Sequence, residues 1–181
     1  MKKKAVAVVM TAVMALGMVS AVSVQAGIED KTLIVGFDAE YPPYGYMDEN
    51  GEYTGFDLEL AQAVCDLEGW ELEKKPINWD SKDMELNSGS IDCIWNGFTM
   101  NGREDDYTFS EPYVDNSQVI VVADDSGIEK LTDLAGKTVG VQAASAALDL
   151  LQSEEEGGQK ELADTFGALN EFADYNTAFT E

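Results

Sequence analysis

Apolar residues fall along the chain in short runs that alternate with stretches of helical spacing. Thr32 to Phe37 is an apolar run with β-branched residues, which predicts a buried strand. Residues 57–67 carry apolar side chains at helical spacing, ending with Leu67, and Gly69 stops the predicted helix. The next elements expected are a strand, a short helix and a third strand, over residues 72–77, 80–86 and 91–95. This alternation favours an α/β fold with a mostly parallel sheet covered by helices.

The pattern changes in the middle of the chain and then resumes. Residues 96–116 are polar, contain glycine and show no period, whereas Val119 to Val122 predict a new apolar strand. The elements expected after it are a short helix, a strand and a helix, over residues 128–134, 138–141 and 145–152. A second α/β lobe is therefore expected to begin near Gln118. Because only about one helical turn follows Asn176, we expect this second lobe to be incomplete.

The first 26 residues have the pattern of a secretory signal peptide. Lys2 to Lys4 form a basic start, Ala5 to Val22 is an apolar run without a charge, and Val24-Gln25-Ala26 is a small-x-small cleavage site. The alternative is a membrane anchor, because the apolar run approaches the ~20 residues needed to span a bilayer. The small residues and the cleavage site favour removal, so we expect the protein to act outside the cytoplasm, in the periplasm or at the cell surface.

Charge and composition narrow the class of protein. Removal of residues 1–26 would take away three lysines and leave 8 basic residues against 35 acidic ones. Such a chain is repelled by nucleic acid and by anionic membrane surfaces, so no nucleic-acid partner is expected. A hydrophobic content of 45% is typical of a globular protein. The only cysteines, Cys65 and Cys93, could form a disulfide in an oxidising compartment or remain buried thiols.

The sequence lacks the usual groups of metal and nucleophilic chemistry. It has no histidine, which removes the commonest general base and the commonest metal ligand. The cysteines lack a CxxC spacing, and the chain has no G-x-S-x-G motif and no phosphate-binding loop. The acidic segment Asp48-Glu49-Asn50-Gly51 fits the turn of a β-hairpin better than a calcium loop. We therefore expect neither a metal nor a cofactor.

Arg103 is the only arginine of the chain, and it follows a turn rich in hydrogen-bond donors. A guanidinium matches a carboxylate through two parallel hydrogen bonds. Together with Asn96, Gly97 and Thr99, it could form a cradle for a small anion. The alternative is a surface ion pair with the acidic residues 104–106, which would contribute little to stability.

Polar and aromatic residues follow each strand of the predicted first sheet. Asp38 and Tyr41 come after the first strand, Trp79 after the second and Asn96 after the third. In an open parallel sheet, ligands bind beyond the carboxyl ends of the strands. Tyr41 and Trp79, which stand next to polar residues, are therefore candidates for the walls of a ligand site.

Several motifs occur in an order that is typical of one family. They are Phe37–Tyr44, Gly51–Asp57, Asn96–Thr99 with Arg103, Phe109–Tyr113 and Leu134–Gln142. These motifs resemble the polar amino-acid-binding proteins of bacterial ABC importers, which form family 3 of the bacterial extracellular solute-binding proteins. The resemblance extends over residues 31–181 and implies a two-lobe, periplasmic-binding-protein-like (type II) α/β fold. The first lobe would span residues 27–113, the hinge 114–118 and the incomplete second lobe 119–181.

The resemblance also implies a function and a set of ligand contacts. The protein would capture a small amino acid between its lobes and deliver it to the membrane permease of an ABC importer, without acting as an enzyme. Arg103 would clamp the ligand carboxylate with help from Gly97 and Thr99, Trp79 would stack on the ligand side chain, and Ser145 would bind from the second lobe. The full set of expected ligand-binding residues is Asp38, Tyr41, Trp79, Asn96, Gly97, Thr99, Arg103, Gln142 and Ser145.

Departures from the family pattern leave alternatives open. The loop before Arg103 is one residue shorter than is common, and Ala144 and Ala146 stand where glycine and hydroxyl residues often flank Ser145. Some family relatives are dehydratases that act on amino-acid-like substrates, which is the alternative function. Others are sensory domains of membrane receptors. A truncated product that does not bind is a further alternative for this chain.

Overall fold

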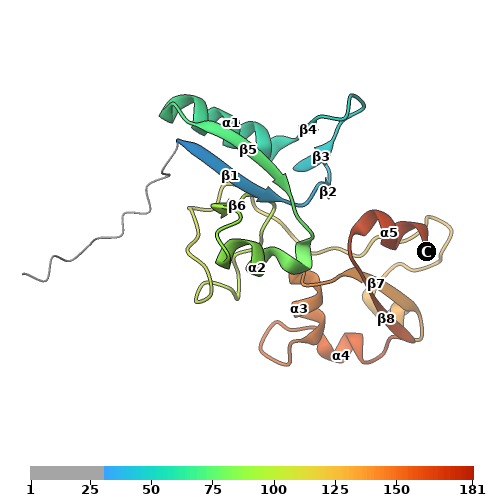
Figure 1. Ribbon diagram of the computed structural model, residues 1–181. Coiled ribbons are helices and arrows are strands. Elements are labelled where there is room, and N and C mark those ends of the chain that lie inside the picture. Colours follow the sequence, from blue (N-terminus) through green and yellow to red (C-terminus); the bar gives the residue numbers. More distant parts are fainter. Residues whose placement is uncertain (1–30) are drawn as a thin grey trace, which may run out of the picture.

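The computed structural model describes residues 31–181, so the predicted signal peptide lies outside the described residues. The described chain contains two α/β units, which lie side by side in Figure 1. The first unit comprises the elements from β1 to β6, and the second comprises those from η2 to α5. This arrangement confirms the α/β class that the alternation of strands and helices predicted.

The first unit is built on a parallel sheet with the order β5-β1-β6. Its strands are β1 (Thr32–Phe37), β5 (Glu71–Pro76) and β6 (Cys93–Ile94). Strand β1 pairs with β5 along its whole length, from Thr32 opposite Glu71 to Phe37 opposite Pro76. Because β1 is central, its side chains Leu33, Val35 and Phe37 are buried and form the core of the unit.

Helix α1 (Phe56–Glu68) covers one face of this sheet (Figure 1). It buries Leu58, Ala61 and Cys65, which lie three to four positions apart and therefore on one side of the helix. Leu67, which the sequence pattern placed on the apolar face, is instead 85% exposed. The helix ends at Gly69, which adopts a left-handed conformation (φ 69°) and donates its N–H to the carbonyl of Cys65.

The remaining elements of the first unit are short. A small antiparallel sheet consists of β2 (Glu40–Tyr41), β3 (Gly45–Met47) and β4 (Tyr53–Thr54), with the expected hairpin between β3 and β4. After β5, the chain forms a 3-10 turn, η1 (Trp79–Ser81), and then α2 (Lys82–Asn87). The predicted short helix after the second strand is therefore confirmed.

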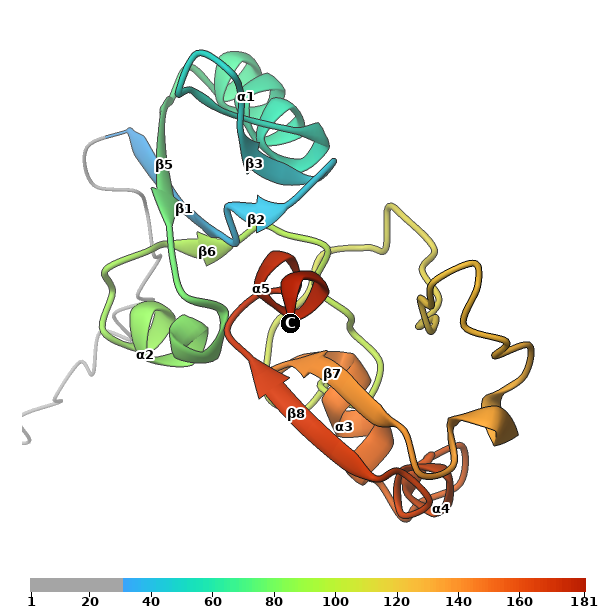
Figure 2. The ribbon, with the colours of Figure 1, turned by 90° about the vertical axis from the view of Figure 1, so that its right-hand side faces the viewer.

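The second unit has a smaller sheet in which two strands pair in parallel. These are β7 (Thr138–Gln142) and β8 (Ala168–Phe172). The helical elements are η2 (Leu131–Leu134), α3 (Ala146–Gln152), α4 (Lys160–Ala163) and α5 (Tyr175–Thr180). Val141, Leu148 and Leu151 form the core between β7 and α3. Helix α5 lies between β2 of the first unit and the second sheet (Figure 2). Its N-cap is Asp174, two residues before Asn176.

The segment between the units, residues 95–130, contains no helix and no strand. The strand predicted for Val119 to Val122 is therefore wrong for this structure. Val119 and Val121 are exposed, and in the described part of the chain no strand pairs with this segment. Its β propensity is not enough by itself, because a strand is stabilised by hydrogen bonds to a neighbour and by burial of one face.

The two cysteines are free thiols, so the structure shows the thiol alternative and not the disulfide. Cys65 is buried and Cys93 half-buried. Burial raises the pKa of the Cys93 thiol to about 11, which keeps it protonated and unreactive near neutral pH. Across residues 31–181, no helix has both the length and the apolarity needed to cross a bilayer.

The difference between Leu58 and Leu67 on α1 gives a test of the core. Replacement of the buried Leu58 by alanine should lower the free energy of unfolding by about 2–5 kcal/mol, because it removes buried methyl groups and leaves a cavity. The matched control, Leu67→Ala on the same helix, should change it by less than about 0.5 kcal/mol. Urea denaturation followed by circular dichroism measures both values. Equal losses would contradict the placement of α1.

Candidate functional site

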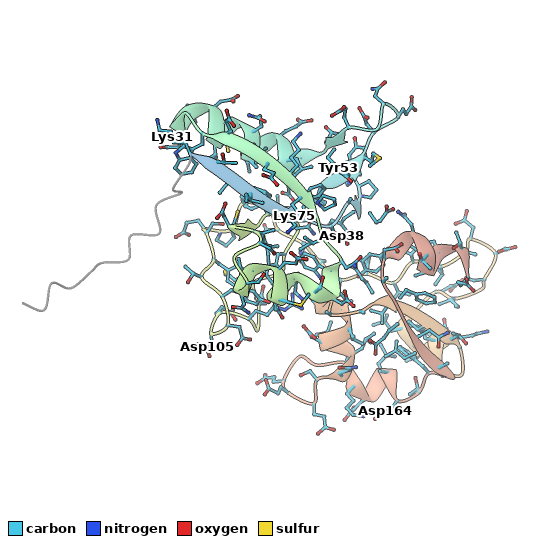
Figure 3. The ribbon with its side chains drawn as sticks, in the orientation of Figure 1. Lys31, Asp38, Tyr53, Lys75, Asp105 and Asp164 are labelled. Carbon is cyan, nitrogen blue, oxygen red and sulfur yellow. The ribbon has the colours of Figure 1, made fainter. Side chains whose placement is uncertain are left out.

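The carboxyl ends of the three parallel strands of the first unit point toward the second unit. Asp38 directly follows β1, and Trp79 begins η1 shortly after β5. Asn96 is the second residue after the end of β6. All three are buried. Figure 3 shows Asp38 at the end of the first sheet that faces the second unit. The parallel register therefore brings together residues that are distant in sequence, as the strand pattern predicted.

A small cavity of about 40 Å³ lies between the two units. The structure brings eight of the nine predicted binding residues to its wall; Asp38 is the exception. The cavity wall also includes three residues that were not predicted from the sequence as ligand contacts: Gln118, Ala146 and Tyr175. Ala146 and Tyr175 begin helices of the second unit, and Gln118 lies in the connecting segment. Local sequence pattern says little about these three residues, because their positions at the wall depend on how the units pack.

Asp38 lies behind the cavity wall and orients two of the wall residues. Its Oδ2 accepts a hydrogen bond from Nε2 of Gln142 at 2.8 Å, across the boundary between the units. Its Oδ1 accepts the N–H of Glu40 at 2.9 Å, and its own N–H donates to Oδ1 of Asn96 at 3.2 Å. Since Asp38 is buried, these hydrogen bonds compensate for its lost hydration.

Arg103 reaches across the boundary in the opposite direction. Its Nη2 lies 2.6 Å from Oδ2 of Asp149 on α3 and 3.4 Å from the carbonyl oxygen of Ala144. Its guanidinium carbon lies 5.0 Å from the centre of the Phe98 ring. The side chain of Arg103 is 11% exposed, so the alternative of a surface pair with residues 104–106 does not describe this structure. Among the described residues, only Nη2 has hydrogen-bond partners, which leaves the other N–H groups of Arg103 available.

The loop between β7 and α3 supplies the second-unit side of the cavity. Ala144 has a left-handed backbone conformation (φ 53°), which is uncommon for a residue with a side chain. Its carbonyl accepts hydrogen bonds from both Arg103 and Lys82. Ser145 follows as the N-cap of α3, where its Oγ accepts the N–H of Leu148 at 3.2 Å. Ser145 is buried and lines the cavity.

Aromatic rings close the cavity on the first-unit side. The ring of Tyr41 stacks on Tyr44 at 5.6 Å and lies 6.5 Å from Tyr175 of α5. Burial raises the pKa of the Tyr41 hydroxyl, and Tyr175 adds to this effect. Gly97 lies against the Tyr41 ring, and a Cβ at this position would come within 2.8 Å of it. Glycine is therefore required here by the close approach of the ring. Trp79 packs edge-to-face with Phe98 at 5.3 Å.

A second buried carboxylate, Asp57, anchors the segment that leaves the first unit. Asp57 lies in the first turn of α1, and its Oδ1 accepts a hydrogen bond from the hydroxyl of Tyr113 at 2.7 Å. Its Oδ2 has no partner among the described residues. Burial raises the pKa of Asp57 above its ordinary value, and the hydrogen bond from Tyr113 opposes that rise. This contact, which the sequence did not predict, ties the connecting segment to α1.

The described residues contain no group of three or more histidine, cysteine, aspartate or glutamate side chains that could hold a metal ion. The charged group at the wall is a guanidinium, and its neighbours are hydroxyl, amide and aromatic side chains. Such an arrangement can bind a small anion through charge-assisted hydrogen bonds.

Residues 33–179 match the sequence model of a protein family, the bacterial extracellular solute-binding proteins, family 3. The chain belongs to this family. Membership in family 3 agrees with the motif order in the sequence and with the arrangement of two α/β units. It confirms the type II periplasmic-binding-protein fold, of which this chain covers a part.

Relatives within family 3 differ in what their names say they bind. The arginine-binding extracellular protein ArtP of Bacillus subtilis (strain 168) is 38% identical over 142 residues, which are 78% of this chain and 52% of ArtP. A Streptococcus pneumoniae ABC uptake transporter substrate binding protein with bound histidine matches with a TM-score of 0.76 and 35% identity, over 83% of this chain and 61% of its own. The ancestral amino acid-binding protein AncCDT-1, a precursor of cyclohexadienyl dehydratase, matches with a TM-score of 0.74 and 32% identity, over 83% and 65%. The chain thus spans about half the length of ArtP.

The contact between Tyr113 and Asp57 predicts a pH-dependent loss of stability. Tyr113→Phe should lower the free energy of unfolding by about 1–3 kcal/mol near neutral pH, because it leaves a buried carboxylate without its donor. The hydroxyl donates to the ionised carboxylate and so holds the pKa of Asp57 down against burial. In the variant, the pKa of Asp57 rises further above its ordinary 3.8. The loss in the free energy of unfolding should therefore shrink as the pH falls to about 4, because Asp57 is then protonated and no longer a buried charge.

Urea denaturation at several pH values measures this loss. Tyr46→Phe is the matched control, because the hydroxyl of Tyr46 makes no hydrogen bond with the described residues. It should change stability little at any pH. A loss for Tyr113→Phe that was independent of pH would contradict the role assigned to Asp57.

Proposed function

We propose that this chain is the amino-acid-binding part of a receptor that delivers a small amino acid to an ABC importer. The observation that carries the proposal is the position of Arg103. Arg103 lines the cavity between the two units together with Thr99 and Ser145, and it keeps N–H donors that are free of partners among the described residues. A carboxylate in this cavity would receive charge-assisted hydrogen bonds from Arg103.

The cavity volume supports a closure mechanism. A volume of about 40 Å³ is too small for an amino acid and its side chain. The two units would therefore have to separate before a ligand could enter, and would close around it afterwards. We propose residues 27–113 and 119–181 as the lobes and residues 114–118 as the hinge. Residues 111–127 are all exposed and lack regular structure, which is consistent with a segment that can change its backbone angles.

In this proposal each binding residue has a defined task. Arg103, Gly97 and Thr99 hold the carboxylate from the first lobe, and Ser145 holds it from the second. Trp79 and Tyr41 pack against the rest of the ligand. The remaining members form a hydrogen-bonded chain that joins the lobes: the wall residues Asn96 and Gln142 and, behind the wall, Asp38. The permease of the importer would be the membrane partner, and the site of action would be the periplasm or the cell surface.

We further propose that the chain is not an enzyme. Its sequence has no histidine to act as a general base. The buried carboxylate of Asp38, behind the cavity wall, already accepts hydrogen bonds from Gln142 and Glu40. The similarity to AncCDT-1 indicates which enzyme activity should be tested as the alternative, because that protein is named as a precursor of cyclohexadienyl dehydratase. Incubation with prephenate and measurement of aromatic product by absorbance would reveal dehydratase activity.

Removal of Arg103 tests the proposal directly. Titration calorimetry of the protein against the twenty amino acids should identify a ligand, and Arg103→Ala should weaken its affinity at least about 30-fold, because a buried charge partner is lost. Arg103→Lys should recover only part of the affinity, since an ammonium lacks the planar fork.

The matched control for this experiment is Lys137→Ala, which removes an exposed positive charge before β7 and away from the cavity. It should leave the affinity unchanged. Unaltered affinity in Arg103→Ala would contradict the proposed function.

A further inference from the structure

Lys82 is a buried cation that neither the sequence analysis nor the proposed ligand contacts include. It is the first residue of α2, and only 4% of it is exposed. Its Nζ lies 5.2 Å from the centre of the Trp79 ring, above the ring face. Trp79 in turn lines the cavity between the units. The ammonium of Lys82 therefore interacts with the same ring that borders the proposed ligand site.

The charge of Lys82 is not neutralised by a direct ion pair with any described residue. Its Nζ donates to the carbonyl oxygen of Ala144 at 3.4 Å, and no carboxylate lies within ion-pair distance of it in residues 31–181. The charged groups that act on it are Asp83, Asp149 and Asp80, which favour its protonated form, and Arg103, which opposes it. Burial is the largest effect and lowers the pKa of Lys82.

One positive charge, that of Arg103, therefore lies at the cavity wall, and a second, that of Lys82, lies over the ring of the wall residue Trp79. A cation is attracted to the face of an aromatic ring by the ring quadrupole. When one cation already interacts with the ring, a second cation nearby gains less from it and is also repelled by the first. This repulsion is strong in a buried site, because the effective dielectric constant there is lower than that of water.

We infer that Lys82 determines the charge selectivity of the amino-acid site, disfavouring a cationic ligand side chain relative to a neutral one of the same shape. An anionic side chain is favoured by the same field. The inference rests on the proposed function, since it concerns the side-chain part of the same ligand site. Lys82 acts through Trp79 and through its charge and does not line the cavity itself.

The test uses two pairs of free amino acids that match in shape and differ in charge. L-arginine and L-citrulline compare a cationic with a neutral side chain, and L-glutamate and L-glutamine compare an anionic with a neutral one. In Lys82→Gln, the ratio of the Kd for arginine to that for citrulline should fall roughly tenfold relative to the wild type. The ratio for glutamate to glutamine should rise. Titration calorimetry on the whole protein gives all four constants.

Two further variants distinguish an electrostatic role from a structural one. Lys82→Arg keeps the positive charge and should keep the wild-type ratios. Lys82→Met also removes the charge and keeps an unbranched apolar stem, so it should show the Kd ratios expected for Lys82→Gln. It replaces Lys82→Gln in the test if that variant folds poorly. The control is Lys74→Gln, which removes a half-buried lysine that donates to the carbonyl of Tyr53, away from the cavity. It should leave both ratios unchanged.

The outcomes separate this inference from the proposed function. If the wild type binds an amino acid and the charge-removing variants weaken all four ligands equally, Lys82 has only a structural role and the inference is wrong. A shift of both ratios in the same direction would also overturn it. If the wild type binds none of the twenty amino acids, the proposed function fails, and this inference fails with it.

Discussion

The carbonyl group of Ala144 lies where the two α/β units meet and accepts hydrogen bonds across their boundary. Two cations, Lys82 of α2 and Arg103 of the connecting segment, donate to this one oxygen. The left-handed backbone of Ala144, which carries a conformational cost for a residue with a side chain, is kept in place by these contacts and by the N-cap of α3 that follows at Ser145. Arg103 also pairs with Asp149, so the same guanidinium contributes to the cavity wall and to the contact between the units.

In the proposed function, this double use of Arg103 would couple ligand binding to the arrangement of the units. A ligand carboxylate at the free N–H groups of Arg103 would meet a side chain that is already held by the second unit. Ligand binding would thereby favour this arrangement, in which Arg103, Ser145 and Gln142 surround the same volume. The hydrogen bond between Asp38 and Gln142 supports this arrangement from behind the wall.

The sequence predicted those parts of the structure that depend on local pattern and on strand direction. The apolar run at residues 32–37 predicted β1, and the parallel order of strands placed Asp38, Trp79 and Asn96 at one edge. The sequence could not predict the partner of Arg103. Asp149 is 46 positions away, and it contacts Arg103 only because the two units pack together. Tyr175 was missed for the same reason. Val119 to Val122 were wrongly expected to form a strand, because periodicity describes a segment and not the presence of a partner for it.

The single arginine of the chain has a consequence for limited proteolysis. A protease specific for arginine has one possible cleavage site in this sequence, directly after Arg103, within the segment that joins the units. In the closed arrangement the side chain that such a protease must recognise is held by Asp149 and Ala144. The rate of this one cleavage therefore reports how often the guanidinium is released, and a bound ligand that keeps the units closed would slow it.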